Sequence, residues 1–223
     1  MTMPAHNNLL KAFSLCLFLF GACPAGVSAQ TADGADSIYA AVDMGLSTEA
    51  LRILREGDET EKDRMIDRII AGPQEFIPPV FYQLSETLIE RGRTPEAPFW
   101  FYAGQLRARY DANRSTDVFT ARVVSDLNDR YAGAIDDYMF TAKNASKIRR
   151  VVKEMLDWDK HTPYEYDQRW IMLYALKIFE FDQDDLPPRR VLTLPESEWP
   201  RIHAETRARY WRECLEAVKR YFK

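Results

Sequence analysis

The composition of this 223-residue chain is that of an ordinary globular protein. It is 46% hydrophobic and 29% charged, which excludes a collagen-like chain, a coiled-coil rod and a wholly disordered chain. The formal charge of -4 gives no electrostatic reason to expect nucleic acid or an anionic membrane surface as a partner. With three Cys and three His, few side chains are available as metal ligands or nucleophiles.

The first 29 residues have the order of a secretory signal peptide. Lys11 precedes an apolar run over residues 12–22, and small residues follow as far as Ala29. This run is too short for a membrane span, which needs about 20 apolar residues. We therefore expect residues 1–29 to be removed during export, which leaves a chain without a membrane span.

A second cleavage site is the alternative. Phe20-Gly21-Ala22-Cys23 resembles a bacterial lipobox, in which Cys23 would carry a lipid anchor. Phe20 replaces the usual Leu and Pro24 follows the cysteine directly, so we favour the plain signal.

Cleavage after Ala29 leaves Cys214 as the one cysteine of residues 30–223, so no intramolecular disulfide can form. A chain of this size can bury its own core without a disulfide. We favour the bacterial periplasm as its location. Secretion stays an alternative, because Asn113 and Asn144 lie in glycosylation-type N-x-Ser patterns.

Apolar residues recur at steps of three or four through most of the remaining chain, which is the spacing of amphipathic helices. After a polar, flexible leader at 30–36, the pattern predicts helices over 118–138, 148–158, 166–181 and 199–222. Loops or turns are expected at 72–73, 78–79, 92, 157–162 and 182–188.

The segment Thr162–Glu165 has the Thr, Pro and Glu of a capping box, which predicts that a helix begins there. Short connections favour antiparallel neighbours, and no strand pattern or shift in composition marks a second domain. We predict one all-α domain over residues 37–223, built from antiparallel helical hairpins that form a single bundle or a short repeat-like array.

Two segments, Gly45–Ala50 and Gly92–Ala97, share the pattern Gly-x-Ser/Thr-x-Glu-Ala. We interpret the Gly as a helix end and Ser47 or Thr94 as the cap of the next helix. On these residues the chain resembles tetratricopeptide and Sel1-like repeats over residues 37–112, a resemblance that implies a scaffold for binding protein or peptide. The alternative is two ordinary helical hairpins with common caps, since the segments lie 47 residues apart and the tetratricopeptide period is about 34.

A second pair of matching segments, Arg107–Tyr110 and Arg207–Tyr210, reads Arg-Ala-Arg-Tyr. We interpret both as solvated helix faces whose tyrosines reach the core. The histidines at 161 and 203 are expected at the surface, and Cys214 is expected to be a small buried hydrophobic residue. No metal-ligand spacing, phosphate loop or catalytic motif is present, so no metal or cofactor is expected.

Acidic residues supply the one enzymatic alternative. The run at 180–185 does not match a calcium loop, because Pro187 occupies the sixth position counted from Asp182. An exported hydrolase could still use carboxylates that meet only in space, from a set of candidates: Asp157, Asp159, Glu180 and Asp182.

Four consecutive aromatic residues at 99–102 would cover every side of a helix, which indicates a deeply buried helix or one that meets a partner. We predict an exported, non-enzymatic helical protein that binds another protein or peptide, for example as an inhibitor or immunity-type protein. The predicted partner-binding residues are Phe99, Trp100, Tyr102, Arg107 and Arg109. A hydrolase and an oligomeric structural protein are the alternatives.

Overall fold

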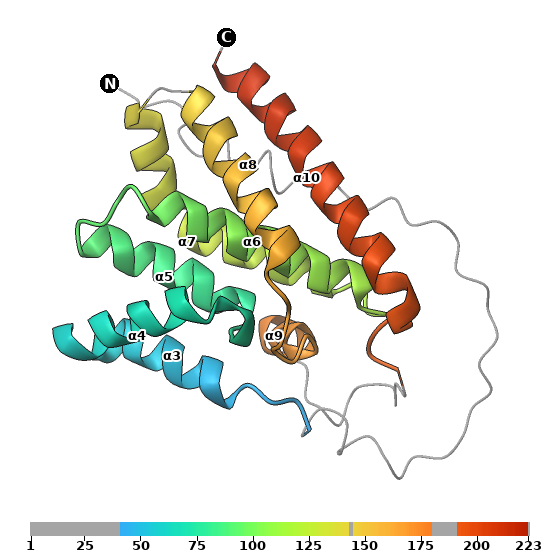
Figure 1. Ribbon diagram of the computed structural model, residues 1–223. Coiled ribbons are helices and arrows are strands. Elements are labelled where there is room, and N and C mark those ends of the chain that lie inside the picture. The colour runs from blue at the N-terminus through green and yellow to red at the C-terminus, as the bar shows by residue number, and fades with distance from the viewer. Residues whose placement is uncertain (1–40, 143–144, 180–190, 223) are drawn as a thin grey trace.

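The computed structural model describes residues 41–142, 145–179 and 191–222, and the secondary structure of these residues is helical, as predicted (Figure 1). The helices are α3 (Gly45–Glu56), α4 (Glu59–Ala71), η2 (Pro73–Glu75), α5 (Pro78–Glu90), α6 (Ala97–Arg114), α7 (Thr120–Ala142), α8 (Ala145–His161), α9 (Trp170–Phe179), η4 (Glu196–Glu198) and α10 (Trp199–Tyr221). One isolated antiparallel bridge joins Ser115 to Thr193 in these residues. The predicted signal peptide, the leader and the loop at 182–188 lie outside them.

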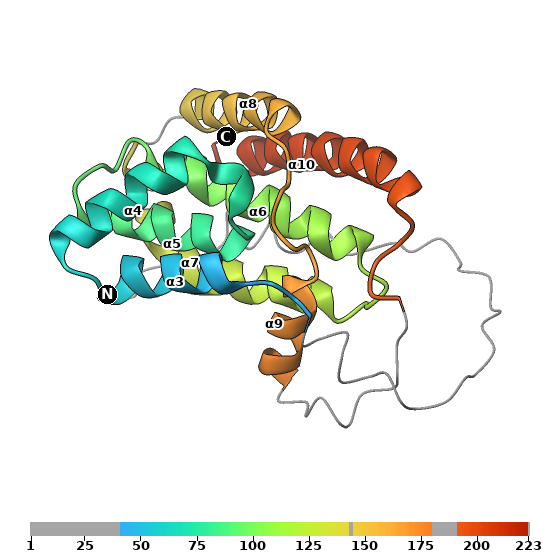
Figure 2. The ribbon, with the colours of Figure 1, turned by 60° about the horizontal axis from the view of Figure 1, so that its bottom comes forward.

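Helix α6 is the centre of the fold. It packs against α5, α7, α8, α9 and α10. Helices α8 and α10 lie side by side and run in opposite directions, as the colours of Figure 1 show. In Figure 2 these two helices form a layer above α6, while α3, α7 and α9 lie below it. We call this pair the α8–α10 layer.

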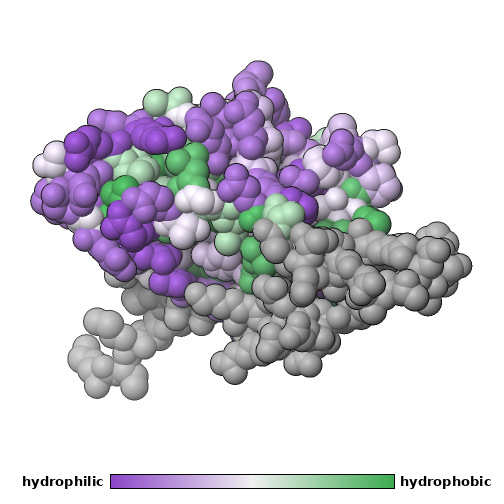
Figure 3. Space-filling model, turned by 90° about the horizontal axis from the view of Figure 1, so that it is seen from below, coloured by the Kyte–Doolittle hydropathy of each residue, from purple (hydrophilic) through white to green (hydrophobic). Residues whose placement is uncertain are grey.

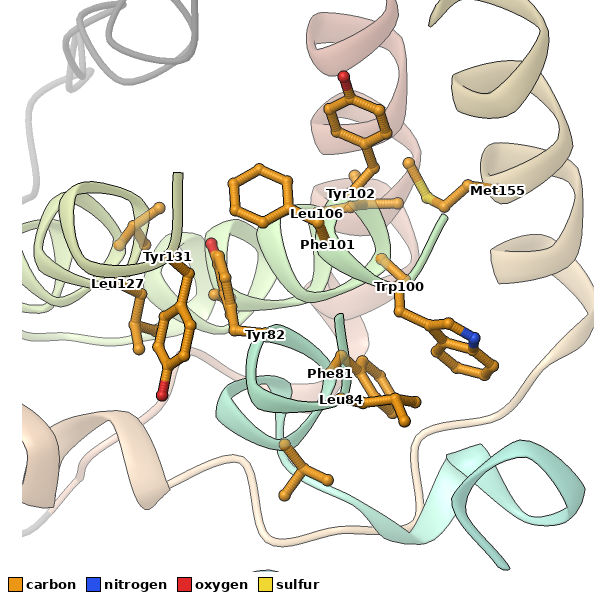
Figure 4. Packing of buried hydrophobic residues seen from close by; sticks show 14 of the residues in the cluster. Phe81, Tyr82, Leu84, Trp100, Phe101, Tyr102, Leu106, Leu127, Tyr131 and Met155 are labelled. Atoms are coloured by element: carbon orange, nitrogen blue, oxygen red, sulfur yellow. The ribbon is translucent and has the colours of Figure 1, made fainter. Parts of the chain in front are cut away.

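The aromatic run explains the central place of α6. Trp100, Phe101 and Tyr102 are buried, and their rings point in different directions (Figure 4). The Trp100 ring lies 5.9 Å from that of Trp158 on α8, and the Phe101 ring lies 5.2 Å from that of Tyr82 on α5. Phe99 is half-buried and contacts the ring of Trp158 at a centroid distance of 5.4 Å. Full burial of one such side chain stabilises the fold by about 1.5–3 kcal/mol. The run is therefore buried, which is one of the two outcomes expected from the sequence.

Helix α5 approaches α6 closely because position 104 has no side chain. A Cβ atom at Gly104 would lie 2.9 Å from Cδ2 of Tyr82 and 3.2 Å from the carbonyl oxygen of Pro78. Both neighbours belong to α5 and both residues are buried. Gly104 therefore sets the distance between the two helices.

Several predicted boundaries differ from the structure. The pair Pro78–Pro79 begins α5 instead of forming a loop, because proline is compatible with the first helical turn. Helix α8 continues through the predicted loop at 157–162 as far as His161. No helix begins at Thr162, whose hydroxyl donates to the carbonyl of Trp158 at 3.0 Å and closes α8. The next helix begins at Trp170. The expected helices at 118–138, 148–158 and 199–222 are confirmed.

The two Gly-x-Ser/Thr-x-Glu-Ala segments differ in local structure. Gly92 has φ 73° at the end of α5, as a helix-ending glycine should. Thr94 caps nothing, because α6 begins after Glu96 without a side-chain cap. Ser47 lies inside α3, where its hydroxyl accepts a hydrogen bond from the N–H of Ile77 at 3.1 Å. Both predicted caps are therefore wrong.

On the face shown in Figure 3, hydrophilic residues cover most of the described surface, and hydrophobic ones form small separate areas. None of the described helices combines the length and the apolar character that crossing a membrane requires.

Candidate functional site

Two arginines from distant helices meet at one buried aspartate. Arg107 of α6 and Arg207 of α10 occupy the same position in the two Arg-Ala-Arg-Tyr segments, and both bind Asp159 of α8. Nε of Arg107 lies 3.2 Å from Oδ1, and Nη1 of Arg207 lies 3.1 Å from Oδ2. Arg107 and Asp159 are fully buried, whereas the Arg207 side chain is 19% exposed. The tyrosines of both segments, Tyr110 and Tyr210, reach the core, as predicted. Arg107 is buried and does not lie on a solvated helix face, contrary to the prediction.

Two further groups complete the surroundings of Asp159. The hydroxyl of Tyr164 donates to Oδ1 at 2.7 Å, and Nε2 of His203 lies 2.8 Å from Oδ2. Burial alone would raise the pKa of Asp159, but the hydrogen bond from His203 and the charge of Arg107 outweigh it. The pKa of this carboxyl is therefore below its usual range, and Asp159 is a buried, charged carboxylate.

Arg107 is enclosed by aromatic rings. Its guanidinium carbon lies 4.0 Å from the centre of the Tyr164 ring and 4.6 Å from that of Trp158. Its Nη2 also donates to the carbonyl of Thr162 at 3.0 Å, while Nη1 has no acceptor among the described residues. The negative faces of aromatic rings stabilise a desolvated cation. Arg107 therefore fixes the segment after α8 against α6.

His203 is part of this cluster and not a surface residue, contrary to the prediction. Its side chain is 16% exposed and its ring stacks on that of Tyr110 at 4.3 Å and 21°. Its Nε2 also lies 2.7 Å from the Tyr164 hydroxyl. The partners come from α6, α8 and the segment after α8, at positions that no local sequence pattern connects to 203.

A second buried aspartate lies one helical turn after Arg107. Asp111 accepts hydrogen bonds from Trp170 at 2.7 Å and from Tyr166 at 3.0 Å, and it pairs with Arg114 at 2.5 Å. Burial raises the pKa of this carboxyl above its usual value even though these three partners act to lower it. Asp111 ties α9 and the segment before it to α6.

The solvent side of the Asp159 cluster borders a groove between α8 and α10. The groove has a volume of about 590 Å³. Its lining repeats the spacing i, i+3, i+4, i+7 on both helices: Lys153, Leu156, Asp157 and Lys160 on α8, and Ala204, Arg207, Ala208 and Trp211 on α10. This spacing places one face of each helix along about 10 Å of groove. We call it the α8–α10 groove.

Charge and apolar surface are combined in this groove. Leu156 is buried and Trp211 is half-buried, while Lys153 and Lys160 are exposed. Lys160 pairs with Asp157 at 2.8 Å. Arg207 reaches the groove and is held from below by Asp159, so its guanidinium has a fixed position. The arrangement suits recognition of an anionic group beside an apolar one.

The predicted partner-binding residues do not form a surface. Trp100, Tyr102 and Arg107 are buried, so these three side chains are not accessible to a partner in this structure. Phe99 is half-buried. Arg109 connects α6 to α10 through an ion pair with Glu213 at 2.6 Å. The five residues contribute to the core and to helix packing, and Arg107 acts on the groove only through Asp159.

The candidate acids of the hydrolase alternative are separated. Asp157 is exposed and paired with Lys160, whereas Asp159, two residues later, is buried against arginines. Glu180 and Asp182 lie outside the described residues. Within the described part of the chain, no group of three or more His, Cys, Asp or Glu side chains is placed to hold a metal ion.

The remaining candidates agree with their expected roles. His161 is exposed at the end of α8, where Nδ1 lies 2.7 Å from the carbonyl oxygen of Asp157. Cys214 is buried in α10, and this burial raises the pKa of its thiol to about 12. A thiol with so high a pKa is a poor nucleophile at neutral pH.

A second pocket, of about 650 Å³, lies where the start of α3 meets the segment before α9. Asp43, Glu75, Glu165 and Asp167 give it an acidic lining. Asp167 is already occupied, because it pairs with Arg169 at 2.6 Å and accepts the backbone N–H of Asp43 at 3.3 Å. These contacts join the chain entering α3 to the segment before α9.

No family model matches this chain, and no curated protein or solved structure is significantly similar to it.

Proposed function

We propose that this chain is an exported, non-enzymatic helical protein that binds another protein or peptide through the α8–α10 groove. The observation that carries the proposal is the lining of that groove, in which a fixed arginine and two exposed lysines border apolar residues. A concave, partly apolar surface with a few oriented polar groups is the usual form of a recognition site.

The charge distribution supports a protein-binding role. Helices α8 and α10 together contain eleven Lys and Arg against six Asp and Glu, a formal charge of +5 in a chain whose total is -4. The rest of the chain therefore has a formal charge of -9. Such separation steers an oppositely charged partner toward one face and increases the association rate.

The structure provides a variant that closes the groove without touching the core. Ala208→Trp places a large ring on the groove lining at an exposed position. Ala71→Trp is the matched control, because Ala71 is exposed at the end of α4. Each variant would be expressed as the full chain in its native envelope, crosslinked and recovered.

We expect a protein that is recovered with the wild type and the Ala71→Trp variant but lost with Ala208→Trp. Equal recovery of the partner with both variants would show that the groove is not the binding site. Recovery of no protein at all would contradict a protein-binding function.

Export is the second part of the proposal, and it depends on the signal-type sequence at 1–29. The intact mass of the protein recovered from the periplasm should correspond to a chain that begins at Gln30. A mass that fits a lipidated Cys23 would instead support the lipoprotein alternative, and a mass that retains Met1 would contradict export by this signal.

A further inference from the structure

We infer that the α8–α10 groove receives an acidic amphipathic helix of a partner protein, with apolar residues along one face and Glu or Asp on its flanks. This inference rests on the proposed binding function and specifies the chemistry of the partner. It follows from the spacing, the shape and the charge of the groove lining.

The spacing of the lining fits a helical partner. Both walls present residues at i, i+3, i+4 and i+7, so the groove follows two turns of each helix. The exposed alanines, Ala204 and Ala208, leave room on the α10 side for the close approach of a third helix. Packed helices lie at interaxial distances of about 8–10 Å that depend on the side chains at the contact, and small residues allow a closer approach.

The apolar residues lie at the bottom of the groove. Leu156 is buried and Trp211 is half-buried, so neither side chain extends far into solvent. A helix with apolar residues at every third or fourth position would reach both of them. A lipid surface is a poorer match, because interfacial binding requires apolar side chains that project from the protein.

The charges of the groove define the flanks of the partner helix. Lys153 and Lys160 lie one at each end of the α8 wall, and Arg207 lies on the opposite wall. The carboxylate of Asp159 holds Arg207 from below at 3.1 Å, and Arg107 shares that carboxylate, so the aspartate does not cancel both positive charges. The Arg207 side chain is 19% exposed, and its guanidinium can donate hydrogen bonds to a partner carboxylate.

The test uses two synthetic amphipathic peptides of about 15 residues, a length near the minimum for a helix in water. Both have Leu at every third or fourth position; one has Glu on the flanks and the other has Lys. Binding to chain 30–223 would be measured by fluorescence anisotropy. We expect the Glu peptide to bind at least about tenfold more tightly than the Lys peptide, with affinity falling as salt rises.

Two double variants locate the site. Lys153→Glu with Lys160→Glu reverses the groove charge at exposed positions, and Arg64→Glu with Arg68→Glu makes the same change in total charge on exposed positions of α4. Circular dichroism would show that both variants fold. We expect the groove variant to lose about tenfold in affinity for the Glu peptide, and the α4 variant to bind like the wild type.

The outcomes separate the two proposals. If both peptides bind equally, or if the two double variants behave alike, the acidic-helix inference is overturned. In that case, loss of the envelope partner with Ala208→Trp would still support the proposed function. If the wild type binds phosphatidylglycerol vesicles and the groove variant does not, the occupant of the groove is an anionic membrane and not a partner helix. A doubled solution mass that Ala208→Trp reverses would identify a second copy of this chain as the occupant.

Discussion

At the scale of single residues, Asp159 determines how three helices meet. It is the shared acceptor of Arg107, Arg207 and Tyr164, and its side chain is fully buried. Taking charges out of water is costly, and the cost is offset only while each charge keeps its partners. The cluster is therefore expected to be sensitive to the loss of any one member.

Asp159→Asn should destabilise the fold by roughly 3 kcal/mol or more, because Arg107 would remain buried without its carboxylate. Asp157→Asn is the matched control, two residues away in the same helix. Asp157 is exposed and pairs with Lys160, so its loss should have a much smaller effect on stability than the loss of Asp159. Urea unfolding of both variants measures the difference. Equal destabilisation would mean that the buried cluster contributes little to stability.

The pKa of Asp159 also sets a pH dependence. Because its pKa is lower in the folded protein, the stabilisation from this group is complete above the unfolded value of about 4 and is lost as the pH falls toward the folded value. Asp111 has the opposite effect on the pH dependence of stability. Its pKa is raised in the folded protein, so protonation of this carboxyl at acidic pH favours the folded state. Urea unfolding at a series of acidic pH values should therefore show a shallower loss of stability below about pH 4 for Asp159→Asn than for the wild type. Parallel curves would contradict this role.

Cys214 gives a prediction in the alkaline range. Burial raises the pKa of its thiol to about 12, so the native protein should react very slowly with iodoacetamide at pH 8 and quickly in urea. Its contribution to stability is present below the unfolded pKa of about 8.5 and is lost as the pH rises toward 12. Mass spectrometry of the alkylated protein measures both rates. Fast labelling of the native protein would show that α10 is not packed as described.

At the scale of elements, the sequence predicted the helices with the clearest periodicity. Helices α7, α8 and α10 fall where apolar residues recur at steps of three or four. Local sequence signals gave wrong predictions at positions where tertiary contacts determine the backbone conformation. The hydroxyl of Thr162 closes α8 instead of starting a helix, and the N–H of Glu165 donates to the carbonyl of Gln74 at 2.9 Å. That contact holds the segment in a non-helical path that no local pattern indicates.

The Asp159 cluster was beyond sequence reasoning for a related reason. His203 and Asp159 are 44 residues apart, and Arg107 is 52 residues from Asp159. One signal was available: the repeated Arg-Ala-Arg-Tyr segments place an arginine at the same position in two helices, and both arginines bind the same carboxylate. A charged residue inside the most aromatic helix also indicates a buried partner, because an unpaired charge would be too costly there.

The packing of α5 on α6 gives a prediction at this scale. Gly104→Ala should destabilise the fold by roughly 1–3 kcal/mol, because the new methyl group would overlap the ring of Tyr82. Gly133→Ala is the control within α7: it meets no atom within 4 Å and should stabilise the helix by up to about 1 kcal/mol. Thermal unfolding measures both. A neutral Gly104→Ala would show that the two helices can separate without cost.

At the scale of the whole molecule, the modest total charge of -4 conceals a strong separation of charge. The +5 of the α8–α10 layer lies in two helices that are distant in sequence and adjacent in space. Composition alone gave no electrostatic reason to expect nucleic acid or an anionic membrane surface as a partner. The fold changes that conclusion for one face, because it collects these two helices into a single surface with a partly apolar groove.

The most direct test of the acidic-helix groove is a charge exchange. The Lys153→Glu, Lys160→Glu variant would be titrated with the amphipathic Lys peptide, and the dissociation constant compared with that of the wild-type protein for the same peptide. If the groove selects its partner by charge, the variant should bind the Lys peptide about tenfold more tightly than the wild type does. An unchanged dissociation constant would contradict the assignment of the α8–α10 groove as the binding site for an acidic helix.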